Sequence, residues 1–243
     1  MNPGLLKVTG AIARREAISA FGTPSGWVVA AILLVPAGIV FAAATFQPGG
    51  PATLREVFQA LGWSMLFVAP AITMRSISEE LRQGTFELLL ATPATEAGIV
   101  LGKFVGAMAQ IAAALAPTAL LALALELHGR PDWGELLCGW VGLLLAGGLY
   151  ASSGVLFSAL TTSQLVAYLS TLFFWLVVAM SARLVVQHAP PWLAAIVHGA
   201  DPLARLRDFT LGLFDTAHVA FFVLATIAAL AGAAIVLRAR RLS

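Results

Sequence analysis

Long stretches without any charged residue are the feature that most constrains this chain. Asp, Glu, Lys and Arg are absent from residues 17–54, 57–74, 104–125, 136–182 and 216–237. Each stretch is long enough, as a helix, to cross the hydrocarbon core of a bilayer, which takes about 20 residues. The whole chain is 60% hydrophobic and only 11% charged, whereas soluble domains carry roughly 25% charged residues. The sequence therefore argues against a water-soluble fold.

The number of spans follows from these stretches. Residues 136–182 are long enough for two crossings, and the polar residues 161–164 in their middle suit a tight hairpin turn. We therefore predict an all-α integral membrane protein with six transmembrane helices. The expected spans are about 27–46, 57–74, 97–125, 136–160, 165–187 and 216–237. An even number of spans places both termini on the same side of the membrane.

The distribution of Lys and Arg predicts the orientation, because cytoplasmic loops carry an excess of both. If the termini are inside, the inner segments hold nine of these residues: Lys7, Arg14, Arg15, Arg75, Arg82, Lys103, Arg238, Arg240 and Arg241. The outer segments then hold five: Arg55, Arg130, Arg183, Arg205 and Arg207. This bias favours cytoplasmic termini.

The N-terminal region has two alternative interpretations. Basic residues precede the first apolar segment and Ala42-Ala43-Ala44 resembles a cleavage site, which is typical of a signal peptide. The segment begins more than 20 residues into the chain, so we expect a retained span instead. Residues 5–21 combine an apolar stripe with a basic flank, which indicates an elbow helix at the membrane interface. The Gly- and Pro-containing residues 22–26 would end this helix. The alternative is an ordinary charged N-terminal tail.

The cysteine count and the net charge add little. The single cysteine, Cys138, lies within an apolar span and can form no intrachain disulfide, so it says nothing about the redox compartment. The net charge of +2 is small and dispersed, so nothing indicates a nucleic-acid partner.

Residues 74–93, which read MRSISEELRQGTFELLLATP, are the most informative segment. Charges cluster on a short predicted helix that Gly84 can end in a left-handed conformation. Thr85 can then cap a second helical segment, which Pro93 interrupts. The result would be a helical excursion from the bilayer that exposes carboxylates beside apolar residues. Such a surface suits docking to a cytoplasmic partner, although an ordinary solvated loop has the same composition.

The start of the third predicted span places Gly98, Gly102 and Gly106 on one helical face. Small residues at this spacing let another helix approach closely, so we expect a packing role in preference to substrate contact. The segment from Gly98 to Lys103 superficially resembles a phosphate loop. It has three residues instead of four between its glycines, and Phe104 instead of Ser or Thr follows the lysine. The chain therefore lacks the Walker pattern for binding ATP.

Proline and apolar segments predict further local features. Pro36, Pro70 and Pro117 lie inside predicted spans, where each removes a helical hydrogen bond and favours a kink. The outer segment 188–215 contains two apolar pieces, 190–197 and 211–214, that are too short to cross a bilayer. We expect these pieces to form short helices in or along the outer membrane surface.

The sequence shows no arrangement of catalytic or metal-ligating residues, so we predict a non-enzymatic chain without a bound metal. His128, His188, His198 and His218 are scattered, and no HExxH pattern or Ser/His/Asp set can be picked out. A few polar residues lie within the predicted spans or the hairpin turn: Gln110, Ser152, Ser153, Ser158 and Gln164. They are candidates for lining a polar pathway, and hydrogen bonds between helices are the favoured alternative.

Three segments together resemble the permease subunits of ABC-2 type transporters. The resemblance is to the branch associated with gliding motility and with maturation of nitrous-oxide reductase. Residues 15–25 resemble that branch's elbow and first span, 74–103 its acidic pair followed by Gly-Thr and Glu-Leu-Leu-Leu, and 207–215 its last outer segment. The middle segment is the most specific. The resemblance extends in order over nearly the whole chain, which implies a single ABC-2 type transmembrane domain over 1–243.

The resemblance implies a bacterial inner-membrane protein that pairs with an identical or related permease and docks on a cytoplasmic ABC ATPase. ATP and magnesium would be bound by that ATPase, and this chain would bind no cofactor. Membrane lipid and an extracytoplasmic accessory protein are further expected partners. The residues at the ATPase-coupling interface would be Ser78, Glu79, Glu80, Leu81, Arg82, Gly84, Thr85 and Glu87.

Three classes of function compete for this chain. The leading one is a transport subunit for export or membrane extraction of an unidentified substrate, which the resemblance implies. The second is a membrane scaffold that uses ATPase-driven motion to act on an extracytoplasmic partner without moving a solute. The third, an intramembrane enzyme, is disfavoured by the lack of clustered catalytic residues.

Overall fold

The computed structural model describes residues 24–45, 50–84, 95–185, 190, 192, 197 and 199–242. The predicted elbow helix at 5–21 lies outside these residues, and so do Thr85 and Glu87 of the predicted coupling interface. The described residues form helices joined by turns and short connections, with no strand among them.

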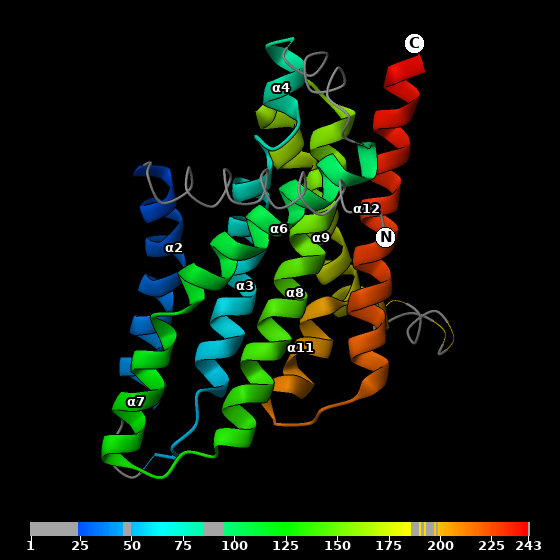
Figure 1. Cartoon of the computed structure of the whole chain (residues 1–243). Helices are drawn as coiled ribbons and strands as arrows, with labels where there is room; N and C mark the ends of the chain where they lie inside the picture. Colours follow the sequence, from blue (N-terminus) through cyan, green and yellow to red (C-terminus); the bar gives the residue numbers. More distant parts are fainter. Residues whose placement is uncertain are drawn as a thin grey trace.

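The described helices follow the chain in a simple up-and-down order (Figure 1). Their bounds are α2 (Pro24–Val40), η1 (Phe41–Thr45), α3 (Arg55–Thr73), α4 (Ser78–Arg82), α6 (Glu96–Leu115), α7 (Thr118–His128), α8 (Trp133–Leu160), α9 (Gln164–Val185), α11 (Pro202–Thr210) and α12 (Thr216–Leu242). Within the described part of the chain, six helical segments are long and apolar enough to cross a membrane, with α6 and α7 together forming one of them. The predicted number of spans is thus confirmed.

Helix α8 is the centre of the bundle. In its most apolar 18-residue window 72% of the residues are buried, against 22% for α2 and 17% for α12. It packs against α3, α6, α9, α11 and α12. The peripheral helices instead expose large apolar side chains, such as Trp27 on α2, Phe173 on α9 and Leu224 on α12. An apolar exterior of this kind matches a lipid environment.

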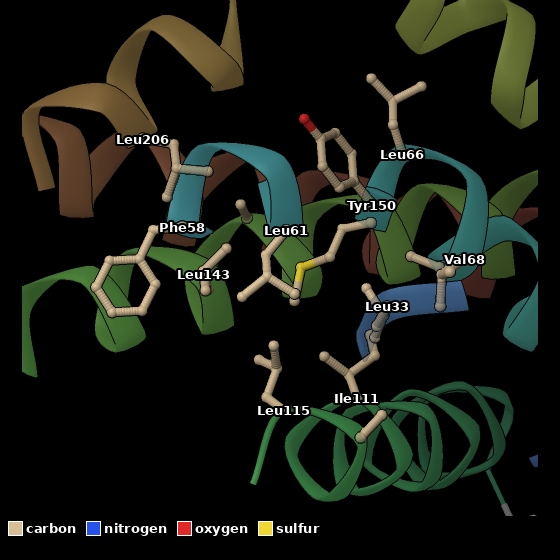
Figure 2. Packing of buried hydrophobic residues seen from close by; sticks show 14 of the residues in the cluster. Leu33, Phe58, Leu61, Leu66, Val68, Ile111, Leu115, Leu143, Tyr150 and Leu206 are labelled. Carbon is tan, nitrogen blue, oxygen red and sulfur yellow. The ribbon is translucent and has the colours of Figure 1, made fainter. Parts of the chain in front are cut away.

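The main core lies where α2, α3, α6 and α8 meet. Figure 2 shows Leu33 of α2, Leu61 of α3 and Ile111 of α6 pointing into the same space, and all three are almost completely buried. Phe58 on α3 and Tyr150 on α8 extend this cluster toward the two sides. The core therefore joins segments that are far apart in the sequence.

Close approach of α3 and α8 depends on a glycine. A Cβ atom at Gly154 of α8 would overlap the hydroxyl of Thr73 on α3. Thr73 is fully buried, and its hydroxyl donates a 2.9 Å hydrogen bond to the carbonyl of Ala69. Only a residue without a side chain fits between these two backbones.

The predicted kink at Pro117 is a break in the helix. α6 ends at Leu115 and α7 begins at Thr118, with a turn at Ala116 and Pro117 between them. The hydroxyl of Thr118 donates to the Leu115 carbonyl at 2.7 Å and accepts a 3.0 Å hydrogen bond from the indole of Trp140 on α8. The break therefore remains hydrogen-bonded to the central helix. In contrast, α2 and α3 continue through Pro36 and Pro70.

The prediction of a short helix at residues 211–214 is wrong. The described helix of this segment is α11, which lies just before them, and residues 211–215 form a turn and an irregular connection. The carboxylate of Asp201 caps α11 by accepting a hydrogen bond from the Leu203 amide at 3.0 Å, and Pro202 suits the first turn. Leu206 and Phe209 are buried against the bundle. The piece at 190–197 lies largely outside the described residues.

We predict that Gly154→Ala destabilises the protein, whereas Gly148→Ala on the same helix does not. A methyl group at Gly148 would find its nearest neighbour, the Met108 sulfur, at 3.6 Å, which is an ordinary contact. Overpacking at Gly154 should lower the free energy of unfolding by about 1–3 kcal/mol. This loss outweighs the roughly 1 kcal/mol by which alanine stabilises a helix relative to glycine. Thermal unfolding of the purified variants in detergent measures both effects. Equal stability of the two variants would show that α3 and α8 are not in close contact there.

Candidate functional site

Helix α4 is a single turn that follows α3 after a turn at Met74–Ile77. Figure 1 places it at the end of the bundle that also holds the α8–α9 turn and the C-terminal part of α12. We call this the α4 end. Gly84 follows the helix with a φ of +68°, a left-handed value that favours glycine. The helix thus ends at Arg82, and Gly84 just after it has the left-handed conformation that was predicted.

A serine of the central span caps α4. Ile77, at the N-cap position, makes no side-chain capping bond. Instead the Ser158 hydroxyl on α8 accepts hydrogen bonds from the amides of Ser78 at 2.9 Å and Ile77 at 3.1 Å. The same hydroxyl donates to the Met74 carbonyl at 3.1 Å. Ser158 is fully buried, and its hydrogen-bonding capacity is fully used.

A buried ion pair joins α4 to α6. The Lys103 ammonium lies 2.8 Å from a carboxylate oxygen of Glu80, and the two side chains are only 3% and 17% exposed. Because both charges lose their hydration, such a pair as a whole contributes little net stability compared with apolar side chains of similar size. Removal of only one partner, however, leaves the other charge unpaired in the interior and lowers stability strongly. The pair therefore holds Glu80 against the bundle.

Glu79 provides the third connection, to α9. Its carboxylate accepts hydrogen bonds from the side chains of Arg82, at 2.7 Å, and Gln83 within the same segment. It also accepts a hydrogen bond from the side-chain amide of Gln164, the first residue of α9. Gln164 thus links α4 to the turn between α8 and α9.

The three connections and the apolar side of α4 act together. Ile77 is fully buried beside Val155 and Ala159 of α8, and Leu81 packs against the same cluster. The helix is thereby connected to α6, α8 and α9 at once. A displacement of α4 must move these spans or break their contacts with it.

The other side of α4 is exposed. Arg82 is 61% exposed in its side chain, and Gln83 and Gly84 are exposed as well. Beside it lies an open groove of about 890 Å³ between α4 and the α8–α9 turn. The groove is lined by Met74, Arg75, Glu79, Arg82, Thr162, Ser163, Gln164 and Leu165. The groove is accessible from outside the bundle and combines charged and polar side chains with the apolar Met74 and Leu165.

Comparison with known proteins identifies the family. The model of the "ABC-2 family transporter protein" family matches residues 11–213, which is most of the chain. This chain belongs to the ABC-2 family of transporter proteins. It is a multi-pass membrane protein, and the matched range includes α4. The finer branch that the sequence resembles stays a prediction.

Two curated relatives of this ABC-2 chain carry the same description. Both are "Probable multidrug ABC transporter permease YbhR", from Escherichia coli K12 and from Escherichia coli O157:H7. Each is 27% identical over 145 residues, which cover 59% of this chain and 39% of the relative. The matched region thus spans well under half the length of these relatives.

The predicted glycine face of this ABC-2 chain lies inside the bundle. Gly98, Gly102 and Gly106 of α6 are all buried. Gly106 lines a small pocket of about 70 Å³ together with Ile72 and Arg75 from the α3 side. The packing role of these three glycines stays a prediction. Glycines of α8, such as Gly154, make close approaches that the sequence spacing did not single out.

The predicted pathway residues occupy separate places. Gln110 lines the 70 Å³ pocket, with Lys103 among its other lining residues. Ser152 and Ser153 are buried and donate to carbonyls three residues back in α8. Ser153 also accepts a 2.7 Å hydrogen bond from the indole of Trp175 on α9. Ser153 and Gln164 therefore make hydrogen bonds between helices within this single subunit. That these polar residues line a pathway stays a prediction.

Sequence reasoning missed two polar clusters at the end opposite α4. The Arg55 guanidinium makes two hydrogen bonds to the Glu135 carboxylate, at 2.6 and 3.1 Å, and joins α3 to α8. His218 lies between Asp208 and Arg205, with 2.8 Å contacts to both. These residues are far apart in the sequence or separated by a turn, so no local motif marks them. Among the described residues, no group of three His, Cys, Asp or Glu side chains could hold a metal ion.

We predict that Lys103→Met strongly destabilises the protein, because it removes the Lys103 ammonium from beside the largely buried carboxylate of Glu80. The expected loss is about 3–5 kcal/mol, and the double change Lys103→Met with Glu80→Leu should restore most of it. Unfolding in a titration of denaturing detergent measures the loss. Arg241→Ala serves as the control, because the pair of Arg241 and Glu96 is more exposed and should contribute about 1 kcal/mol or less. A double variant no more stable than the single one would contradict the assignment.

Proposed function

We propose that this chain is the permease subunit of an ABC transporter whose ATPase is a separate polypeptide, and that α4 is its docking helix. One observation carries the proposal. α4 presents an exposed charged side at one end of the bundle, while its other side is held by three membrane spans. A partner that moves α4 would therefore do mechanical work on the spans.

The ATPase is assigned to another chain for a structural reason as well as a sequence reason. Residues 98–103, which superficially resemble a phosphate loop, lie in the first two turns of the regular helix α6 and form no loop. The Gly98 amide donates to the Thr95 hydroxyl and the Ile99 amide to the Thr95 carbonyl, so these amides are used in capping and starting the helix and do not surround a phosphate. ATP and magnesium would then be bound by the partner.

We further propose pairing with a second permease, identical or related, and export or membrane extraction as the activity. The exposed apolar faces of α2, α9 and α12 provide surface for both lipid and a second subunit. The substrate class is open. Because the curated relatives are described as multidrug permeases, amphipathic drug-like compounds are the first to test. Stimulation of ATP hydrolysis by such a compound in proteoliposomes would favour transport over a scaffold role.

The α4 end is proposed to face the cytoplasm. Arg75 and Arg82 lie there, together with Arg238, Arg240 and Arg241 near the end of α12. Cytoplasmic segments carry the excess of basic residues. The membrane in question would be a bacterial inner membrane.

This orientation predicts the labelling of two single cysteines. In a Cys138→Ser background, a membrane-impermeant maleimide added to intact spheroplasts should label Arg130→Cys but not Arg82→Cys. Both side chains are exposed and they lie at opposite ends of the bundle. Permeabilised cells should label both positions. The reverse pattern in intact spheroplasts would invert the proposed topology.

Charge reversal tests the docking helix. We expect Arg82→Glu to weaken binding of the ATPase to the permease by about tenfold or more, which corresponds to about 1.4 kcal/mol. Arg130→Glu makes the same change at the opposite end and should leave binding unaltered. Affinity between the permease in nanodiscs and the purified ATPase is the measurement. Equal affinities for both variants would show that the exposed side of α4 is not in the interface.

A further inference from the structure

We propose that Ser158 is the positioning residue through which movement of α4 enters the central span α8. The inference rests on the proposed function, because it takes α4 to be the element that the ATPase moves. It adds a specific route by which that movement would reach the membrane. Ser158 contacts neither ATP nor substrate in this account, and it acts through the backbone of another segment.

The hydrogen bonds of Ser158 differ from those of the other serines of α8. Ser152 and Ser153 donate to carbonyls of their own helix, at 2.9 and 2.8 Å. Ser158 instead directs its three hydrogen bonds to one turn of another segment, the one that contains Met74, Ile77 and Ser78. These partners are 80 to 84 positions away in the sequence. The hydroxyl therefore serves as the missing N-cap of α4, supplied by another helix.

This contact is stiffer than the other two polar connections of α4. Lys103 and Gln164 reach α4 through long side chains that can follow a moving partner by rotating several bonds. Ser158 has one side-chain torsion, and its partners are backbone atoms that cannot rotate away. A hydrogen bond is lost once its heavy atoms separate beyond about 3.5 Å. A small displacement of α4 must then carry α8 along or break the contact.

The place of Ser158 in the fold favours propagation. α8 packs against α3, α6, α9, α11 and α12. Close by, Val155 and Ala159 of α8 form a buried cluster with Ile77 and with Leu237 of α12. A shift that enters α8 at Ser158 therefore has direct contact with most of the bundle.

The contact itself can be measured by hydrogen exchange of the permease–ATPase complex without nucleotide. In Ser158→Ala the amides of Ile77 and Ser78 lose their acceptor, and their exchange should become about fivefold faster, as expected for loss of a helix cap of about 1 kcal/mol. Ser152→Ala is the matched control, since Ser152 is equally buried but bonded only within its own helix. Unchanged exchange in Ser158→Ala would overturn the inference.

Transmission is tested with a fluorophore at Leu160→Cys, in a Cys138→Ser background. Leu160 ends α8 and is 51% exposed. Trapping the complex with ATP and vanadate should change the probe signal when Ser158 is present, and Ser158→Ala should reduce that change at least fivefold. Binding of the ATPase should stay the same, because the exposed side of α4 is retained. Ser158→Thr keeps the hydroxyl and should restore the response.

The outcomes separate this inference from the proposed function. A full probe response in Ser158→Ala would refute transmission through this residue, even if docking on α4 is correct. A response lost equally in Ser158→Ala and Ser158→Thr would also refute it, because the hydroxyl would not be the relevant group. If Arg82→Glu binds the ATPase normally and vanadate trapping changes nothing in the unmodified complex, the proposed function itself is wrong.

Discussion

The turn between α3 and α4 must satisfy its backbone polar groups within the protein, and the arrangement of the α4 end depends on how it does so. Amides and carbonyls buried away from water are costly unless they are hydrogen-bonded. α4 has no side-chain cap of its own, and Ser158 of α8 supplies the acceptor and the donor that the turn requires. The short helix is thereby fixed to the most buried span of the bundle.

Charged side chains join the helices at both ends of the bundle, whereas the middle relies mainly on apolar packing with a few hydrogen bonds such as that from Trp175 to Ser153. At the α4 end, Arg241 lies 2.8 Å from Glu96, and Arg240 donates to the carbonyls of Ala159 and Leu160. At the opposite end Arg55 holds Glu135. Between these ends the helices approach closely at small residues such as Gly154. The end where a soluble partner would bind is therefore rich in polar contacts.

The sequence predicted the features that depend on local composition or on the length of a segment. Charge-free stretches predicted the six spans, Gly84 predicted the end of α4, and Pro117 predicted a kink that proved to be a break. Residues 211–214 were predicted as a short helix from apolar content alone. The capping residue Asp201 instead starts a helix that ends at Thr210.

The contacts of the candidate site could be predicted only in part. The charged segment of α4 was visible in the sequence, because its acidic pair and Gly84 are neighbours. Its partners Ser158 and Gln164 were noted only as polar residues in or near spans, since they come 80 or more positions later and their register against α4 is set by helix packing. The local sequence around a serine in an apolar span does not show whether its hydroxyl bonds to its own helix or to another segment.

The central claim, that α4 is the place where a separate ATPase docks, is tested most directly by site-specific photo-crosslinking in living cells. A photoreactive amino acid at Arg82 should yield one main adduct whose second component is a Walker-motif ATPase, and the same residue at Arg130 should not. An ATPase adduct from Arg130 in place of Arg82, or the absence of any ATPase among the Arg82 adducts, would contradict the account.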